Sequence, residues 1–160
     1  FEFIEGAIEA LKHLINLGKN LIIVTNQSGI ARGYYTEEEY LQLEVMMLDE
    51  MKSFGINILD VYHCPHHVDG VVPSLSIQCS HRKPSPGMIL SAINDHSLDP
   101  SRSIIIGDKE SDIEAGENAK LAGKYLINPN HNIHELGSTA DAVYQSLYDF
   151  VKNTFELKND

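Results

Sequence analysis

Short apolar runs alternate with helical patterns along the chain. Residues 21–25 have the continuous apolar character of a buried strand, and four further strands are predicted at residues 56–62, 103–106, 124–127 and 142–144. Apolar residues at helical spacing, or helix start signals, predict helices at about 8–17, 37–54, 86–96, 111–122 and 147–155. This alternation predicts a single α/β domain over residues 1–160, with a parallel sheet and helices on both faces.

Local signals mark the ends of several predicted helices. Thr36, followed by Glu39, is a capping-box pattern that should begin the second helix. Gly18, Gly55 and Gly123 are expected to end the helices that precede them.

Composition and charge limit the classes of function. Hydrophobic residues make up 42% of the 160 positions and charged residues 22%, which is ordinary for a globular protein. The formal net charge of −11 disfavours nucleic acid or an anionic membrane as a partner. The chain shows no apolar run long enough to span a bilayer and no secretory leader pattern. We therefore expect a cytoplasmic protein.

Polar loops follow two predicted strands and precede one helix. Thr25, Asn26, Gln27, Ser28 and Gly29 end the first strand and could offer hydroxyls and N–H groups to an oxyanion, although a plain strand-to-loop transition explains them equally well. Before the third helix, Arg82 and Lys83 are either anion-binding cations or solvated charges.

An acidic loop follows the third strand. Asp108 comes directly after the strand and Gly107, where a carboxylate suits Mg²⁺. Asp112 could support that site or be the N-cap of the next helix.

A loop at about residues 63–82 carries a possible zinc site. Its C-x-H…C-x-H pattern consists of Cys64, His66, Cys79 and His81. Four such ligands suit a closed, structural, tetrahedral Zn²⁺ site, and a metal would keep the long loop ordered. Either His63 or His67 could replace a histidine of the set. The alternative is a surface loop with two free cysteines and solvated histidines.

The polar loops, in their order and spacing, resemble motifs two, three and four of the haloacid dehalogenase (HAD) superfamily phosphatases. The resemblance implies a Rossmann-like three-layer fold without a large cap domain. Thr25 matches the residue that binds the transferred phosphoryl group, and Lys83 matches the lysine that neutralises it. Asp108 matches the Mg²⁺ ligand, supported by Asp112.

Residues 24–33, 64–67, 82–84 and 107–109 are similar to bacterial D-glycero-D-manno-heptose 1,7-bisphosphate phosphatases and related histidinol-phosphate phosphatases. The resemblance implies removal of the 7-phosphate through a phosphoaspartyl intermediate, in the synthesis of lipopolysaccharide precursors. It implies substrate contacts from Thr25, Asn26, Gln27, Ser28, Arg82, Lys83 and Lys109. In these families a cysteine stands at the position of His81. The replacement of a thiolate by a neutral imidazole makes the possible zinc site less negative by about one charge.

The family's first motif, Asp-x-Asp after a central strand, is absent from this sequence. Its first aspartate is the nucleophile, so we expect this chain alone to be inactive. Loss of the strand would leave two unpaired edges inside the sheet. We expect about 25 further residues upstream, and a monomer when complete. The alternatives are a histidinol-phosphate phosphatase, a catalytically dead zinc-stabilised binding module and, more remotely, a zinc-ribbon nucleic-acid binder.

Overall fold

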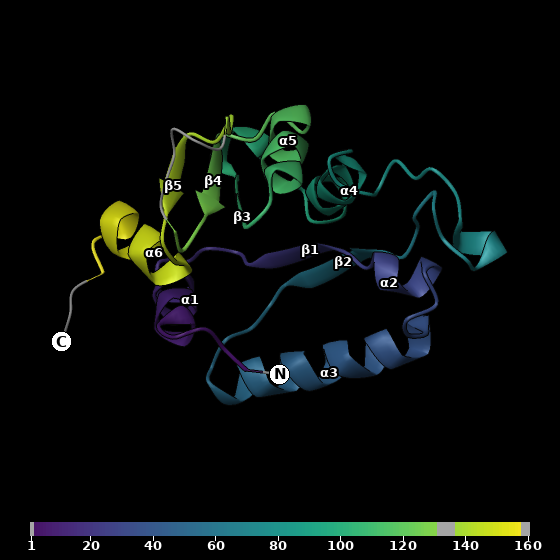
Figure 1. Ribbon diagram of the computed structural model, residues 1–160. Coiled ribbons are helices and arrows are strands. Elements are labelled where there is room, and N and C mark those ends of the chain that lie inside the picture. The colour runs from purple at the N-terminus through teal and green to yellow at the C-terminus, as the bar shows by residue number, and fades with distance from the viewer. Residues whose placement is uncertain (1, 131–136, 158–160) are drawn as a thin grey trace.

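A computed structural model describes residues 2–130 and 137–157, in which helices alternate with parallel strands (Figure 1). The strands are β1 (Ile22–Asn26), β2 (Asp60–Cys64), β3 (Ile104–Gly107), β4 (Gly123–Ile127) and β5 (Ala142–Tyr144). The helices are α1 (Ala7–Asn16), α2 (Ser28–Ala31), α3 (Glu37–Ser53), α4 (Gly87–Asp95), α5 (Glu110–Asn118) and α6 (Leu147–Phe155). The predicted α/β class is confirmed.

The parallel strands form two separate sheets. β1 pairs with β2 from Ile22 opposite Asp60 to Asn26 opposite Cys64. β4 lies between β3 and β5 and pairs with both. Within the described residues no backbone ladder joins β1 to β3, so each leaves an edge unpaired at the middle of the fold (Figure 1). The predicted pair of open edges is therefore confirmed.

Side chains hold the two sheets together although no strand does. Val24 of β1 packs against a buried cluster that includes Ile89 of α4 and Ile105 of β3. A second cluster joins α1 to α6, where Phe150 is fully buried among aromatic rings. The apolar surface shared across the break fixes how the ends of β1 and β3 face each other.

Helix α3 shows why the predicted capping box forms. The backbone N–H of Glu39 donates to Thr36 Oγ1 at 3.1 Å, and the N–H of Thr36 donates to Glu39 Oε2 at 2.8 Å. The helix buries only Tyr40 and Met51. No helix in the described part of the chain combines the length and apolar character needed to cross a bilayer.

Two predicted boundaries are wrong for local reasons, and one short helix was not predicted. The second strand begins at Asp60 and not at 56, because the N–H of Ile56 donates to Met51 O at 3.0 Å and closes the end of α3. Helix α5 ends at Asn118, because Lys120 takes a left-handed φ of 57°. Gly123 therefore begins β4 and does not end a helix. The short helix α2 lies where the sequence predicts only a loop.

Candidate active site

Strand β1 and helix α5 meet at Lys83, which lies in the polar loop before α4. Lys83 Nζ donates to the carbonyl oxygen of Val24 at 2.9 Å and to Asp112 Oδ1 at 2.5 Å. The Lys83 side chain is only 11% exposed. One largely buried ammonium group thus bridges β1 and the first turn of α5, across the break between the two sheets.

Asn26, the last residue of β1, fixes the backbone of Lys83. Its Nδ2 donates to Lys83 O at 3.1 Å, and its Oδ1 accepts from the Lys83 N–H at 3.0 Å. This reciprocal pair occupies both polar atoms of the Asn26 side chain. Asn26 therefore holds the lysine loop against β1, and the predicted contact of Asn26 with substrate remains a prediction.

Asp112 is buried and directed inward. It is 5% exposed, and its second oxygen, Oδ2, accepts from the Lys109 N–H at 3.1 Å. Asp112 is the third residue of α5 and Lys109 is the N-cap, so the alternative of Asp112 as the N-cap is wrong. A buried carboxylate needs such partners, because an unpaired one is costly to desolvate.

Gly107 makes the approach of Asp112 possible. A Cβ at position 107 would lie 2.2 Å from Asp112 Oδ2 and 2.4 Å from Asp112 Cβ. We expect Gly107→Ala to lower the free energy of unfolding by about 1–3 kcal/mol, as overpacking does. Urea denaturation measures this change, and a midpoint equal to that of the parent protein would show that Asp112 moves aside freely.

Asp108 lies in a different setting from Asp112. It is exposed and lines a cavity of about 330 Å³ with Glu110, at the carboxyl ends of β3 and β4. Glu110 Oε1 accepts from Thr139 N at 3.0 Å and from Thr139 Oγ1 at 3.2 Å. Within the described residues the Asp108 carboxylate has no such partner, which leaves its oxygens available to a cation.

The other residues predicted to contact substrate differ in how far they are exposed. Thr25 is half-buried at the end of β1, and its Oγ1 accepts from Gln27 Nε2 at 3.0 Å. Ser28 is the first residue of α2. Arg82 is half-buried, and its Nη1 is buried without a partner among the described residues. Lys109 is exposed.

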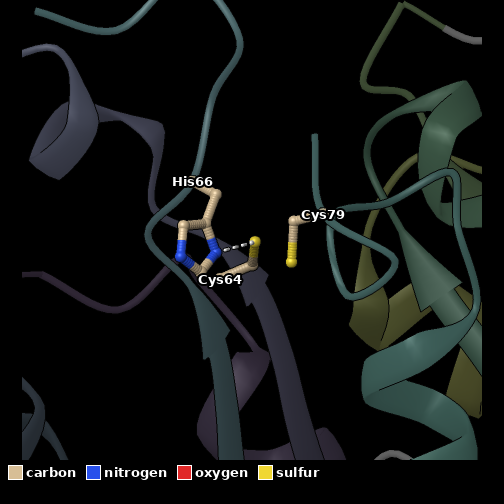
Figure 2. Close-up of side chains that lie close together, drawn as sticks. All are labelled: Cys64, His66 and Cys79. Atoms are coloured by element: carbon tan, nitrogen blue, oxygen red, sulfur yellow. Dashed lines mark hydrogen bonds between the residues drawn. The ribbon is translucent and has the colours of Figure 1, made fainter. Parts of the chain in front are cut away.

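Three of the four predicted zinc ligands lie together. The ligand atoms of Cys64, His66 and Cys79 are within 4.8 Å of one another, and Cys64 Sγ lies 3.7 Å from His66 Nδ1 (Figure 2). Zn–S bonds of about 2.3 Å place the sulfurs of a tetrahedral site roughly 3.8 Å apart, so this donor set fits the ion with small shifts. Burial, followed by the neighbouring Cys79, raises the pKa of the Cys64 thiol to about 11.

The remaining histidines of the loop lie outside this cluster. His81 is exposed, and its Nε2 lies 3.3 Å from Ser91 Oγ. His63 Nε2 lies 2.8 Å from Glu37 Oε1, and His67 Nε2 lies 3.0 Å from Arg32 Nη2. Neither His63 nor His67 therefore lies with the cluster of Cys64, His66 and Cys79. The role of His81 as a zinc ligand stays a prediction.

Comparisons with known proteins identify relatives of this chain. The HAD-hydrolase-like family model matches residues 80–150. The D-glycero-β-D-manno-heptose-1,7-bisphosphate 7-phosphatase of Pasteurella multocida is 41% identical over 160 residues, which covers 99% of this chain and 86% of that protein. The D-glycero-α-D-manno-heptose-1,7-bisphosphate 7-phosphatase of Photorhabdus laumondii is 47% identical over 84% of this chain and 74% of its own.

A solved structure shows the same fold. The D,D-heptose 1,7-bisphosphate phosphatase of B. bronchiseptica, complexed with magnesium and phosphate, aligns with a TM-score of 0.82 at 22% identity, covering 96% of this chain and 83% of its own. Together with the sequence identities above, the match shows that the chain belongs to the heptose-1,7-bisphosphate 7-phosphatase family of HAD-type hydrolases.

Proposed function

We propose that this protein removes the 7-phosphate of D-glycero-D-manno-heptose 1,7-bisphosphate with Mg²⁺ as its cofactor. The observation that carries the proposal is the position of Lys83, whose Nζ contacts Val24 O of β1 and Asp112 Oδ1 of α5. A buried cation held at the ends of parallel strands provides a fixed positive charge for a phosphoryl group. The names of the relatives support the choice of substrate.

Each predicted residue then has a role that fits its position. The Thr25 hydroxyl and Lys83 would hold phosphoryl oxygens. Asp108 would bind Mg²⁺, which neutralises charge that develops during phosphoryl transfer. Asp112 would hold Lys83 in place, and its support of the Mg²⁺ site remains a prediction. Arg82 and Lys109 would contact the rest of the substrate.

The nucleophile of the proposed reaction is an aspartate that this sequence does not contain as Asp-x-Asp. We place it on a further strand that pairs with the open edges of β1 and β3. Both edges are unpaired in the described part of the chain. A strand there would end beside Thr25 and Lys83, because the carboxyl ends of parallel strands meet at one edge of the sheet.

The test is phosphate release from heptose 1,7-bisphosphate, with and without Mg²⁺, by this chain and by its full gene product. We expect Mg²⁺-dependent release from the full gene product alone. If the full gene product hydrolysed histidinol phosphate faster than heptose 1,7-bisphosphate, histidinol phosphate would become the proposed substrate. No release from either ester by a folded full-length protein would overturn the phosphatase proposal.

We also propose that Cys64, His66 and Cys79 hold a structural Zn²⁺, with His81 as fourth ligand after its side chain leaves Ser91. Elemental analysis should find one zinc per chain. Cys64→Ser should remove the metal, whereas His81→Ala should retain it with lower affinity, because three of the four ligands remain. Because metal binding is coupled to folding, chelation should lower the Tm of the parent protein.

His67→Ala is the matched control for the histidine variant, since His67 contacts Arg32 and lies outside the cluster. Equal zinc affinity in His81→Ala and the parent would leave His81 without a role at the metal. A purified protein that contains no zinc and does not respond to chelation would contradict the site as a whole.

A further inference from the structure

Gln27 and Tyr35 form a chain of hydrogen bonds that begins at Thr25 and leads away from the proposed phosphoryl site. Tyr35 OH donates to Gln27 Oε1 at 2.6 Å, and Gln27 Nε2 donates to Thr25 Oγ1 at 3.0 Å. All three residues are half-buried. Tyr35 thus lies at the outer end of a three-residue chain whose inner end is the Thr25 hydroxyl.

The two distances indicate how the Gln27 amide is oriented. A separation of 2.6 Å suits an O–H···O hydrogen bond, whereas 3.0 Å is typical of N–H···O. The amide oxygen therefore faces Tyr35 and the amide nitrogen faces Thr25. With the amide reversed, the Thr25 hydroxyl would donate to Gln27 and its proton would no longer be available.

The orientation determines what Thr25 can offer to a ligand. Because Thr25 Oγ1 accepts from Gln27, its own hydrogen is free, and the described part of the chain provides no other acceptor for it. A free O–H donor suits the oxygens of a phosphoryl group, which are acceptors.

The backbone beside Tyr35 is arranged for this contact. Tyr35 lies against Gly29, where an added Cβ would come within 2.3 Å of the Tyr35 ring. The N–H of Tyr34 donates to Gly29 O at 2.8 Å, which holds the segment before Tyr35 against α2. Tyr34 itself is 74% exposed and has no part in the chain of hydrogen bonds.

We propose that Tyr35 is a positioning residue that acts through Gln27 to keep the Thr25 hydroxyl a hydrogen-bond donor toward the phosphoryl group. The inference rests on the proposed function for the identity of the ligand. Tyr35 does not touch the substrate in this arrangement. It fixes the amide of Gln27, and the amide fixes the proton of Thr25.

The test is Tyr35→Phe in the full gene product, assayed by kcat/KM on heptose 1,7-bisphosphate and by binding of inorganic phosphate. Loss of one hydrogen bond should lower kcat/KM and phosphate affinity by about 3–10-fold. Tyr34→Phe is the matched control and should leave both unchanged. Thr25→Val should lower kcat/KM by roughly 100-fold, as loss of an oxyanion donor does.

A double-variant cycle separates positioning from general stability. Adding Tyr35→Phe to Thr25→Val should cause no further loss of kcat/KM or phosphate affinity, because the hydroxyl that Tyr35 orients is already absent. Equal effects in both backgrounds would overturn the relay, as would unchanged phosphate affinity in Tyr35→Phe. If the parent hydrolyses no ester, the proposed function fails, but phosphate binding still tests the relay.

Discussion

Lys83→Met is expected to have two separate effects, one on activity and one on stability. Methionine keeps the length of the side chain but removes the cation that would hold the phosphoryl group, so kcat/KM should fall roughly 1,000-fold. It also leaves Asp112, 5% exposed, with the Lys109 N–H as its one remaining partner among the described residues. Breaking a buried ion pair from one side costs about 3–5 kcal/mol of unfolding free energy. Urea denaturation and the Mg²⁺-dependent phosphate assay measure the two effects.

A second variant distinguishes them. Lys83→Met combined with Asp112→Leu replaces both charges by apolar groups, and should recover most of the stability without recovering activity. Lys124→Met is the control, because Lys124 is 14% exposed but its partners Glu117 and Asp141 are 63% and 45% exposed. Each of these pairs should contribute less than about 1 kcal/mol. If Lys83→Met kept full activity, Lys83 would have no part in the proposed reaction.

Features set by neighbouring residues could be predicted from the sequence. The capping box at Thr36 and Glu39 depends on two side chains three positions apart, and both of its hydrogen bonds form. The location of the site follows from strand ends, since parallel strands present their carboxyl ends on one edge. The end of α5 was predicted wrongly, because Lys120 adopts a left-handed conformation that usually marks a glycine.

Features set by distant contacts could not be predicted in this way. Nothing in the spacing of Lys83 and Asp112 indicates that they pair, because 29 positions separate them and the fold alone brings them together. The hydrogen bond from Tyr35 to Gln27 also depends on the fold, although only eight positions separate the two residues. His81 has suitable spacing for a ligand, yet its side chain contacts Ser91. Spacing along the chain thus indicates contacts between residues a few positions apart, but neither the pairing of distant residues nor the direction in which a side chain points.

Asp108→Asn is expected to remove Mg²⁺-dependent activity without affecting stability. Asp108 is exposed, and within the described residues its carboxylate has no hydrogen-bond or ion-pair partner, so asparagine should leave the Tm unchanged. Loss of one anionic oxygen ligand weakens the hold on a hard cation, and kcat/KM at a fixed low Mg²⁺ concentration should fall about 100-fold or more. Raising the Mg²⁺ concentration should recover part of this loss, because the remaining amide oxygen is a weaker ligand.

Glu114→Gln supplies the matched control, since it changes the same unit of charge at an exposed position of the neighbouring helix α5. Its Mg²⁺ dependence should equal that of the parent. Asp112→Asn, unlike Asp108→Asn, should lower the Tm, because it weakens the buried partner of Lys83. If Asp108→Asn kept the parent's Mg²⁺ dependence, Asp108 would not be the metal ligand. The ion would then have to be held by Asp112 or by residues on the strand that we place between β1 and β3.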